Sequence, residues 1–242
     1  MRRRGVARGS LVAALAVAAL PAAGCFDIDA RSAEYGNLRV KGAVRDALNG
    51  ATLAGAAVCV HFPVGNPPPC ATSGADGRFD LYPVPAETDA LLSVRKSGQE
   101  QVLQTVDADE DLDAALLTVS ETAIRLLVLG AGGKDNMATG NLLLRALDAN
   151  GKGVSGVSFA VNPPSGYMRY LDENLAPMQT GGNKTSSSGA AVVVNAAPGD
   201  YTVNFAGREC ALAGLAWSGT GPGTARSRVE RGMSTVTSFA CK

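Results

Sequence analysis

Five side chains have the types and spacing that enzymes use for nucleophilic or acid–base chemistry. Ser93 and Lys96 have the Ser-x-x-Lys spacing of a nucleophile and its base, but residues three apart on a strand point to opposite faces. The adjacent carboxylates Asp172 and Glu173 diverge, so they cannot flank a scissile bond. His61, the single histidine, has no serine-led turn beside it. We therefore expect a protein that is not an enzyme.

A glycine-rich stretch at 130–133 follows the apolar residues 127–129, which is how a dinucleotide-binding turn begins. The third glycine of that fingerprint would fall at Asp135, where a carboxylate repels phosphate. The segment that follows, 142–147, has the pattern of a strand and not of a helix. We therefore expect a linker here and no cofactor.

The acidic run 107–113 offers several carboxylates, the ligands that Ca²⁺ prefers. The run lacks the central glycine and the distal glutamate of a helix-loop-helix calcium site. We interpret it as a solvated linker and expect no metal site. Calcium binding is the alternative interpretation.

The first residues have the layout of an export signal. Arg2, Arg3, Arg4 and Arg8 precede an apolar run at 11–20, which is too short to span a bilayer. Small residues then lead to Cys25, and the segment resembles a bacterial lipobox, although Ala22 stands where that motif usually has Leu. The resemblance implies a signal peptide at 1–24, lipidation of Cys25 and a polar tether at 25–36. Ordinary cleavage that leaves Cys25 as a free thiol is the alternative.

Charge and composition narrow the class of partner. The chain has 22 basic and 22 acidic side chains, and removing a leader with four Arg leaves 18 basic residues and a net charge of −4. A mildly acidic protein with only 5% aromatic residues is not expected to bind nucleic acid. We expect an exported protein, held at the bacterial outer membrane or cell surface as a lipoprotein. Without lipidation it would be periplasmic or secreted.

Two similar runs of short strands make up the rest of the chain. The first unit has expected strands at 38–44, 56–62, 78–82 and 90–95, separated by turns at 49–50, 75–77 and 83–85. The second has expected strands at 140–148, 156–161, 191–194 and 201–205, with turns at 150–151, 185–189 and 198–200. The same order occurs twice, so we infer an internal repeat of a small β-sandwich.

Residues 39–97 resemble a carboxypeptidase regulatory-like domain. The resemblance rests on Gly42-x-Val44-x-Asp46, on 53–60, on 75–79, and on Leu92-x-Val94-x-Lys96-x-Gly98. It implies a prealbumin-like sandwich that serves as a non-catalytic module in envelope proteins. Residues 140–205 resemble a looser relative of the same Ig-like group, with a longer middle loop at 167–182.

A helix is expected between the two units, over 114–131. Residues 118–121 fit a capping box with Thr118 as N-cap, and Ile124, Leu127 and Val128 form an apolar stripe. A strand at 124–129 is the alternative. The expected fold is all-β, with two Ig-like or prealbumin-like Greek-key β-sandwich domains at 37–106 and 136–242. An acidic linker and short α-helix at 107–135 would join them.

Four cysteines remain if Cys25 carries lipid. Cys59 and Cys70 flank a proline-rich insert, and Cys210 and Cys241 bracket the last segment, so we expect one local disulfide in each unit. Buried, reduced cysteines are the alternative.

The expected function is that of a non-catalytic envelope lipoprotein, a structural or protein-interaction module displayed at the membrane surface. A carbohydrate-binding module, or an accessory subunit of an envelope peptidase or transporter, is the alternative. The expected partners are the membrane, through the lipid, and an envelope protein or glycan. Candidate contact surfaces are the loop from Cys59 to Cys70, the loop from Tyr167 to Tyr170 and the stretch around Trp217. The aromatic residues Tyr167, Tyr170 and Trp217 are the candidate contact residues, because aromatic side chains with a polar tip favour interfaces. Plain packing is the alternative for all three, and for Trp217 it is the favoured one.

Overall fold

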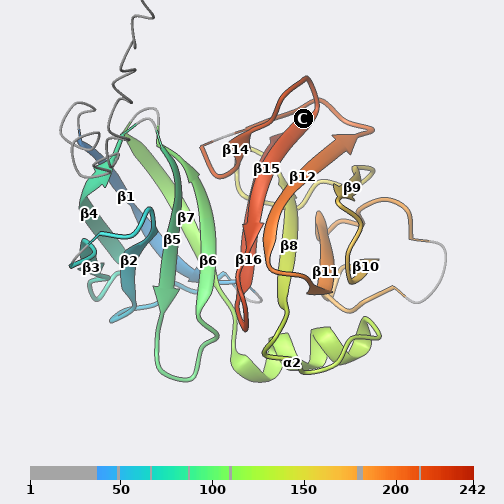
Figure 1. Ribbon diagram of the computed structural model, residues 1–242, viewed down its shortest axis with the longest axis horizontal. Helices are drawn as coiled ribbons and strands as arrows, with labels where there is room; N and C mark the ends of the chain where they lie inside the picture. Colours follow the sequence, from blue (N-terminus) through green and yellow to red (C-terminus); the bar gives the residue numbers. More distant parts are fainter. Residues whose placement is uncertain are drawn as a thin grey trace, which may run out of the picture.

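The computed structural model describes residues 37–242, except 48–49, 66, 87, 109–110, 179–181 and 213. The predicted signal peptide, Cys25 and the tether lie outside these residues. The described part of the chain consists mainly of β-strands, arranged in two halves with the helix α2 (Glu121–Gly130) beneath the second half in the view (Figure 1).

Two layers of strands form the first half. One layer has the order β4-β1-β7, in which β1 runs antiparallel to β4 and parallel to β7. The other has the order β6-β5-β2-β3. Valine and leucine side chains from both layers, among them Val44, Val58, Leu81 and Leu92, form the core between them. The strands are β1 (Asn37–Asp46), β2 (Ala57–Phe62), β3 (Cys70–Thr72), β4 (Arg78–Pro85), β5 (Asp89–Arg95), β6 (Val102–Asp107) and β7 (Leu112–Thr118).

The second half is also a sandwich of two layers. The order β10-β11-β8-β16 faces the order β14-β15-β12-β9, and β13 adds to β16. Leu144, Phe159, Val193, Tyr201 and Phe239 lie in the core between the layers. The strands are β8 (Gly140–Leu147), β9 (Ser158–Asn162), β10 (Tyr167–Tyr170), β11 (Ala190–Ala196), β12 (Gly199–Ala206), β13 (Cys210–Ala211), β14 (Trp217–Ser218), β15 (Thr224–Val229) and β16 (Ser234–Cys241).

A parallel strand pair joins the halves. Ser234 to Val236 on β16 pair with Val102 to Gln104 on β6, so one nine-stranded sheet runs through both sandwiches. The hydroxyl of Thr105 donates a hydrogen bond of 2.8 Å to the carbonyl of Leu215 across the same junction. Each half therefore has its own core, and the halves share a layer.

The internal repetition inferred from the sequence is visible in the strand pairing. In the first half β1 pairs with β4 and β7, β2 with β5, and β5 with β6. In the second half β8 pairs with β11 and β16, β9 with β12, and β12 with β15, in the same orientations. Even the irregularity in β1–β4 recurs, since the register shifts after Leu81 in β4 and after Val193 in β11.

A buried hydroxyl group fastens the loop before the second strand of the first half. The Ser73 hydroxyl accepts a hydrogen bond from the Ala56 backbone N–H at 2.9 Å and donates one to the Leu53 carbonyl at 2.7 Å. Both backbone groups would otherwise be unsatisfied in the interior. We call this arrangement the hydroxyl clasp.

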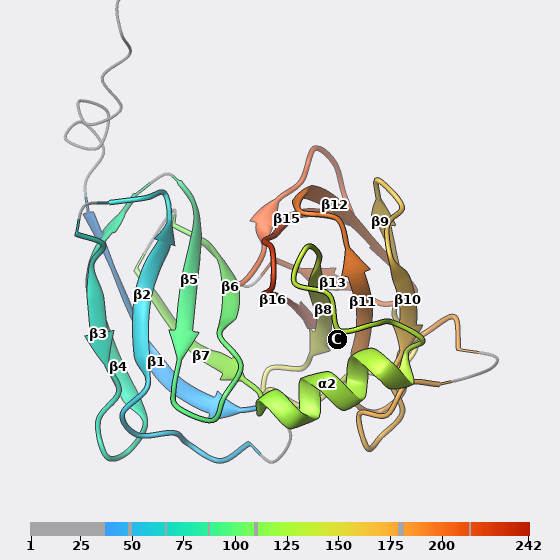
Figure 2. The same cartoon turned by 60° about the horizontal axis from the view of Figure 1, so that its bottom comes forward.

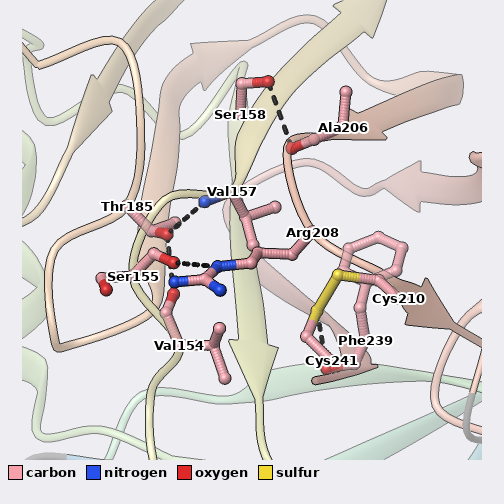
Figure 3. The surroundings of a disulfide bond; sticks show 10 residues. All are labelled: Val154, Ser155, Val157, Ser158, Thr185, Ala206, Arg208, Cys210, Phe239 and Cys241. Atoms are coloured by element: carbon pink, nitrogen blue, oxygen red, sulfur yellow. Dashed lines mark hydrogen bonds between the residues drawn. A yellow bond between two sulfur atoms is a disulfide. The ribbon is translucent and has the colours of Figure 1, made fainter.

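The second half has the same hydroxyl clasp. The Thr185 hydroxyl accepts from the Val157 backbone N–H at 3.0 Å and donates to the Val154 carbonyl at 2.7 Å (Figure 3). The clasp therefore repeats at the level of single atoms, although the two residue types differ.

The helix prediction was wrong at its N-terminal end. Residues 112–118 form β7, and the helix begins only at Glu121, with Ser120 and not Thr118 as its N-cap. The apolar side chains of 114–117 have good helix propensity, but parallel pairing with β1 supplies backbone hydrogen bonds along one side of this segment and overrides it. Ile124 and Val128 are buried as expected of a helical stripe, so the alternative strand at 124–129 is not formed.

Two other local expectations differ from the structure. The proline turn expected at 83–85 lies within β4, which runs to Pro85. The long loop expected at 167–182 contains β10, which pairs with β11.

Candidate functional site

A groove lies between the two halves and continues under α2. Two cavities, of about 640 Å³ and about 300 Å³, form it, and Ala47 and Arg145 line both. The larger cavity lies between the end of β1, the edge strand β7, β8 and β16. The smaller cavity, which we call the α2 groove, lies between α2, β8 and the loop 171–177.

Alternation along β8 decides which side chains reach the α2 groove. Leu142 and Leu144 belong to the core between the layers. Leu143 and Arg145 therefore point to the opposite face of the sheet. Leu143 packs there against a cluster that includes Val128 of α2, so the helix covers this outer face of the sheet.

Local sequence places α2 over that face. The Ser120 side chain accepts a hydrogen bond from the Ala123 backbone N–H at 3.2 Å, which satisfies one of the unpaired amides at the start of the helix. Glu121 in the first turn suits the positive end of the helix dipole. Figure 2 shows α2 across the end of the second half, below β8 and β11 in the view.

Arg145 is the buried cation of the α2 groove. The residue is only 9% exposed, and its Nε is buried with no hydrogen-bond partner among the described residues. None of the ion pairs between described residues includes it. Burial lowers the pKa of Arg145, yet an arginine stays protonated at neutral pH. The groove therefore contains a positive charge that can make strong, charge-assisted hydrogen bonds to an anion.

Acidic residues line the larger cavity but not the α2 groove. Asp46, Asp113 and Asp148 border the larger cavity. Hydrogen bonds from the backbone N–H groups of Lys152 and Asn150 lower the pKa of Asp148, and they hold its carboxylate at the β8 turn. Arg145 is the one charged residue among the described residues that line the α2 groove.

A third cavity, of about 260 Å³, borders α2 and contains three carboxylates, those of Glu100, Glu121 and Asp135. Burial raises the pKa of Glu100, the charges of Glu121 and Asp135 raise it further, and a hydrogen bond with Ser234 opposes the shift. No group of three or more His, Cys, Asp or Glu side chains in the described part of the chain could hold a metal ion.

The disulfide prediction is confirmed for both pairs. Cys59 and Cys70 join β2 to the edge strand β3, and Cys210 and Cys241 join β13 to β16. Figure 3 shows the second bond, together with Arg208, whose Nε donates to the Ser155 carbonyl at 3.2 Å. Each bond closes a loop within one half.

The three aromatic residues predicted as a contact surface differ in exposure. Trp217 is 3% exposed, and its indole N–H donates to the Ala90 carbonyl at 2.9 Å across the junction between the halves. Tyr170 is 6% exposed, and its hydroxyl bonds both the N–H and the carbonyl of Phe159. Tyr167 is 52% exposed. The packing alternative therefore describes Trp217 and Tyr170, and Tyr167 remains as the exposed candidate.

Sequence reasoning singled out none of the residues of the α2 groove as a site. Ser93, the serine of the Ser-x-x-Lys pair, lies in β5 and donates a hydrogen bond of 3.4 Å to the Cys59 carbonyl. The glycine-rich stretch at 130–133 follows a helix and not a strand, unlike a dinucleotide-binding turn.

No helix in the described ranges combines the length and the apolar character needed to cross a membrane.

Comparisons with known proteins give distant structural similarity only. No family model and no curated protein matches the sequence. The minor pilin GBS52 of Streptococcus agalactiae superposes with a TM-score of 0.29 and 14% identity, covering 85% of this chain and 95% of the pilin. The shaft pilin SpaA of Lactobacillus rhamnosus GG gives 0.25 and 11%, covering 86% and 98%. A streptococcal ancillary pilin gives 0.26 and 12%, covering 84% and 69%. These scores are low, so the β-sandwich assignment rests on the strand pairing and the two cores.

Proposed function

We propose that this protein is an exported, lipid-anchored module of the bacterial envelope, with a structural or protein-interaction role and no catalytic activity. The observation that carries the proposal is the cysteine pairing. Two local disulfides account for four of the five cysteines, and the fifth is Cys25, at the end of the predicted leader. Disulfides of this kind form and persist in oxidising compartments outside the cytosol.

The shared sheet supports a structural role. Pairing of β6 with β16, and the Trp217 hydrogen bond to Ala90, tie the two halves into one body. A tethered body of this kind can hold its loops at a defined distance from the membrane. In this proposal the first half is a carboxypeptidase regulatory-like module, and the second is an Ig-like relative.

The burial of Tyr170 and Trp217 counts against the carbohydrate-binding alternative. A sugar-stacking platform would need these rings on the surface beside Tyr167. An envelope protein is the partner class that we favour.

The anchor is tested by expressing the full chain in a bacterium that is fed labelled palmitate. We expect label on the full chain, recovery with the membrane, and loss of both for Cys25→Ser. The matched control is Ala30→Ser, a similar small change in the predicted tether, which should behave like the unaltered chain. Equal labelling of Cys25→Ser would refute the lipid anchor.

The interaction role is tested separately, by crosslinking in intact cells. We expect one envelope protein to be captured by the anchored chain, and to be lost when surface-exposed loop residues such as Tyr167 are changed. Crosslinks that form only between copies of this chain would argue against the interaction role.

A further inference from the structure

The α2 groove combines an apolar lining with a charge that has no counter-ion among the described residues, and this combination selects a ligand class. Its walls come from α2, β8 and the loop after β10, and they include Ile124, Leu127, Leu143, Leu171, Leu175 and Pro177. Apart from Arg145, Asn174 is the one polar side chain among the described residues that line it. The volume of about 300 Å³ lies at the lower end of the range of small-molecule sites.

Leaving the Arg145 guanidinium without a partner in the α2 groove is unfavourable in free energy. A buried charge costs free energy unless it is paired and hydrogen-bonded. The outward-facing neighbours of Arg145 across the sheet are Ala190 on β11 and Ser238 on β16, and neither carries a charge. The nearby cavity supplies acids, but none of them forms an ion pair with Arg145.

We propose that the α2 groove binds an apolar monocarboxylate, with the carboxylate on Arg145 and the hydrocarbon body under α2. A planar guanidinium matches a carboxylate with two parallel hydrogen bonds. A single cation suits one negative charge, whereas a phosphate dianion would need a second cation, and the described residues of the lining offer none. A sugar is a poor fit because its hydroxyl groups would meet leucine, isoleucine and proline side chains.

The wider cavity between the halves gives the ligand a route of entry. It shares Ala47 and Arg145 with the α2 groove, so the carboxylate can reach Arg145 from that side. The site does not depend on the lipid anchor, because every residue that forms it belongs to the folded body.

Equilibrium dialysis with labelled decanoate tests the proposal. The protein is the full chain carrying Cys25→Ser, which keeps any attached lipid out of the assay. We expect saturable binding of one equivalent, and binding of 1-decanol, which lacks the charge, that is weaker by about tenfold or more. A second arm uses a short peptide that ends in two leucines, with a free or an amidated C-terminus. This arm distinguishes a fatty acid from a peptide carboxylate as the source of the ligand.

Two pairs of variants connect binding to the groove. Arg145→Gln should weaken binding by about tenfold or more, whereas Arg125→Gln, which removes an exposed arginine of α2, should leave it unchanged. Leu126→Glu places a negative charge at the groove lining on a residue that is 65% exposed, so it should block the carboxylate without unfolding the protein. Leu129→Glu, on the same helix but outside the lining, is its control.

Absence of saturable binding by both decanoate and the free peptide would overturn the proposal. Binding that survives both Arg145→Gln and Leu126→Glu would also overturn it, because the ligand would then occupy another place. If Arg145→Gln fails to fold, the Leu126→Glu and Leu129→Glu pair decides.

Discussion

β4 and β11 hold matching positions in the two halves, but their outer faces differ in burial. The two strands match because the carbonyls of Gly77 and Gly189, which precede them, accept the N–H groups of Val44 and Ala146 at equivalent points. Matching outward positions then differ in burial. They are exposed on β4, as Arg78, Asp80 and Tyr82, and buried on β11, as Ala190, Val192 and Val194.

The difference comes from α2, which covers the second half only. The first half presents Arg39, Lys41 and Arg45 on the outer face of β1, all exposed to solvent. On β8 the position that matches Ala43 of β1 is Arg145, which α2 and the loop 171–177 bury. The repeated strand pairing therefore gives stability, and the added helix creates the candidate site.

The largest expected effect comes from introducing an aspartate at matching positions of β11 and β4. Val194→Asp puts a carboxylate under α2 on a residue that is fully buried, and should lower the free energy of unfolding by about 4 kcal/mol. Tyr82→Asp, on an exposed face, should cost about 1 kcal/mol, the value of a lost surface contact between the ring and Arg39. Urea unfolding of the oxidised protein measures both. Equal costs would mean that α2 does not cover β11.

The two disulfides should differ according to the length of the loop that each one closes. The sequence separations are 11 for Cys59–Cys70 and 31 for Cys210–Cys241. Loop-closure entropy then gives about 2.8 kcal/mol for the first and about 3.7 kcal/mol for the second. Unfolding of the Cys59→Ala/Cys70→Ala and Cys210→Ala/Cys241→Ala proteins measures the difference. A larger loss of stability on removing Cys59–Cys70 would show that the position of a disulfide at a strand edge, and not the length of its loop, determines the cost.

The two hydroxyl clasps should have nearly equal value. Ser73→Ala and Thr185→Val each leave a buried N–H and a carbonyl without their partner, which costs about 2 kcal/mol. The two sites lie in different cores, so the double variant should show the sum of the two costs within about 0.5 kcal/mol. Thr185→Ser, which keeps the hydroxyl, is the control. Clearly unequal losses of stability would show that the two hydroxyl clasps are not equivalent.

The smallest effect concerns the acids at the start of α2. The raised pKa of Glu100 means that the folded protein holds the proton of this group more tightly than the unfolded chain does. The ionised carboxylate therefore opposes folding above the folded pKa, and this penalty disappears as the pH falls below the unfolded value. Water screens this half-exposed group, so Glu100→Gln should stabilise the protein at pH 7 by only about 0.5 kcal/mol. The gain should vanish near pH 4, as unfolding at both pH values would show. A gain that grows toward low pH would contradict this assignment.

Much of the strand frame could be predicted from local sequence. Turn glycines such as Gly77 and Gly189 and the alternation in β1 and β4 mark strands without tertiary information. The prediction missed four of the longer strands, β6, β7, β15 and β16. β6 and β15 pair antiparallel with β5 and β12. β7 and β16, with residues such as Leu116 and Phe239, are held as strand by parallel pairing with β1 and β8. Parallel partners lie far apart in the chain, so no local pattern reveals them.

The candidate site was not predictable in the same way. Arg145 looks like an ordinary arginine of a strand, and only the cover supplied by α2 and the loop 171–177 makes it a buried cation. One signal was available in the sequence. The uninterrupted apolar run at 190–194 indicates a strand buried on both faces, unlike the alternating 78–82 at the matching place.

The position of β16 has a consequence for the order of assembly. This strand follows all the others in the chain, yet it lies between β8 and β6 in the shared sheet. If the chain is exported as proposed, from its N-terminus, it can complete the first core, and its Cys59–Cys70 bond, while later residues are still in transit. The parallel strand pairing between the halves must wait for Ser234 to Val236, so a translocation arrested before them would leave the first half with an open edge on β6.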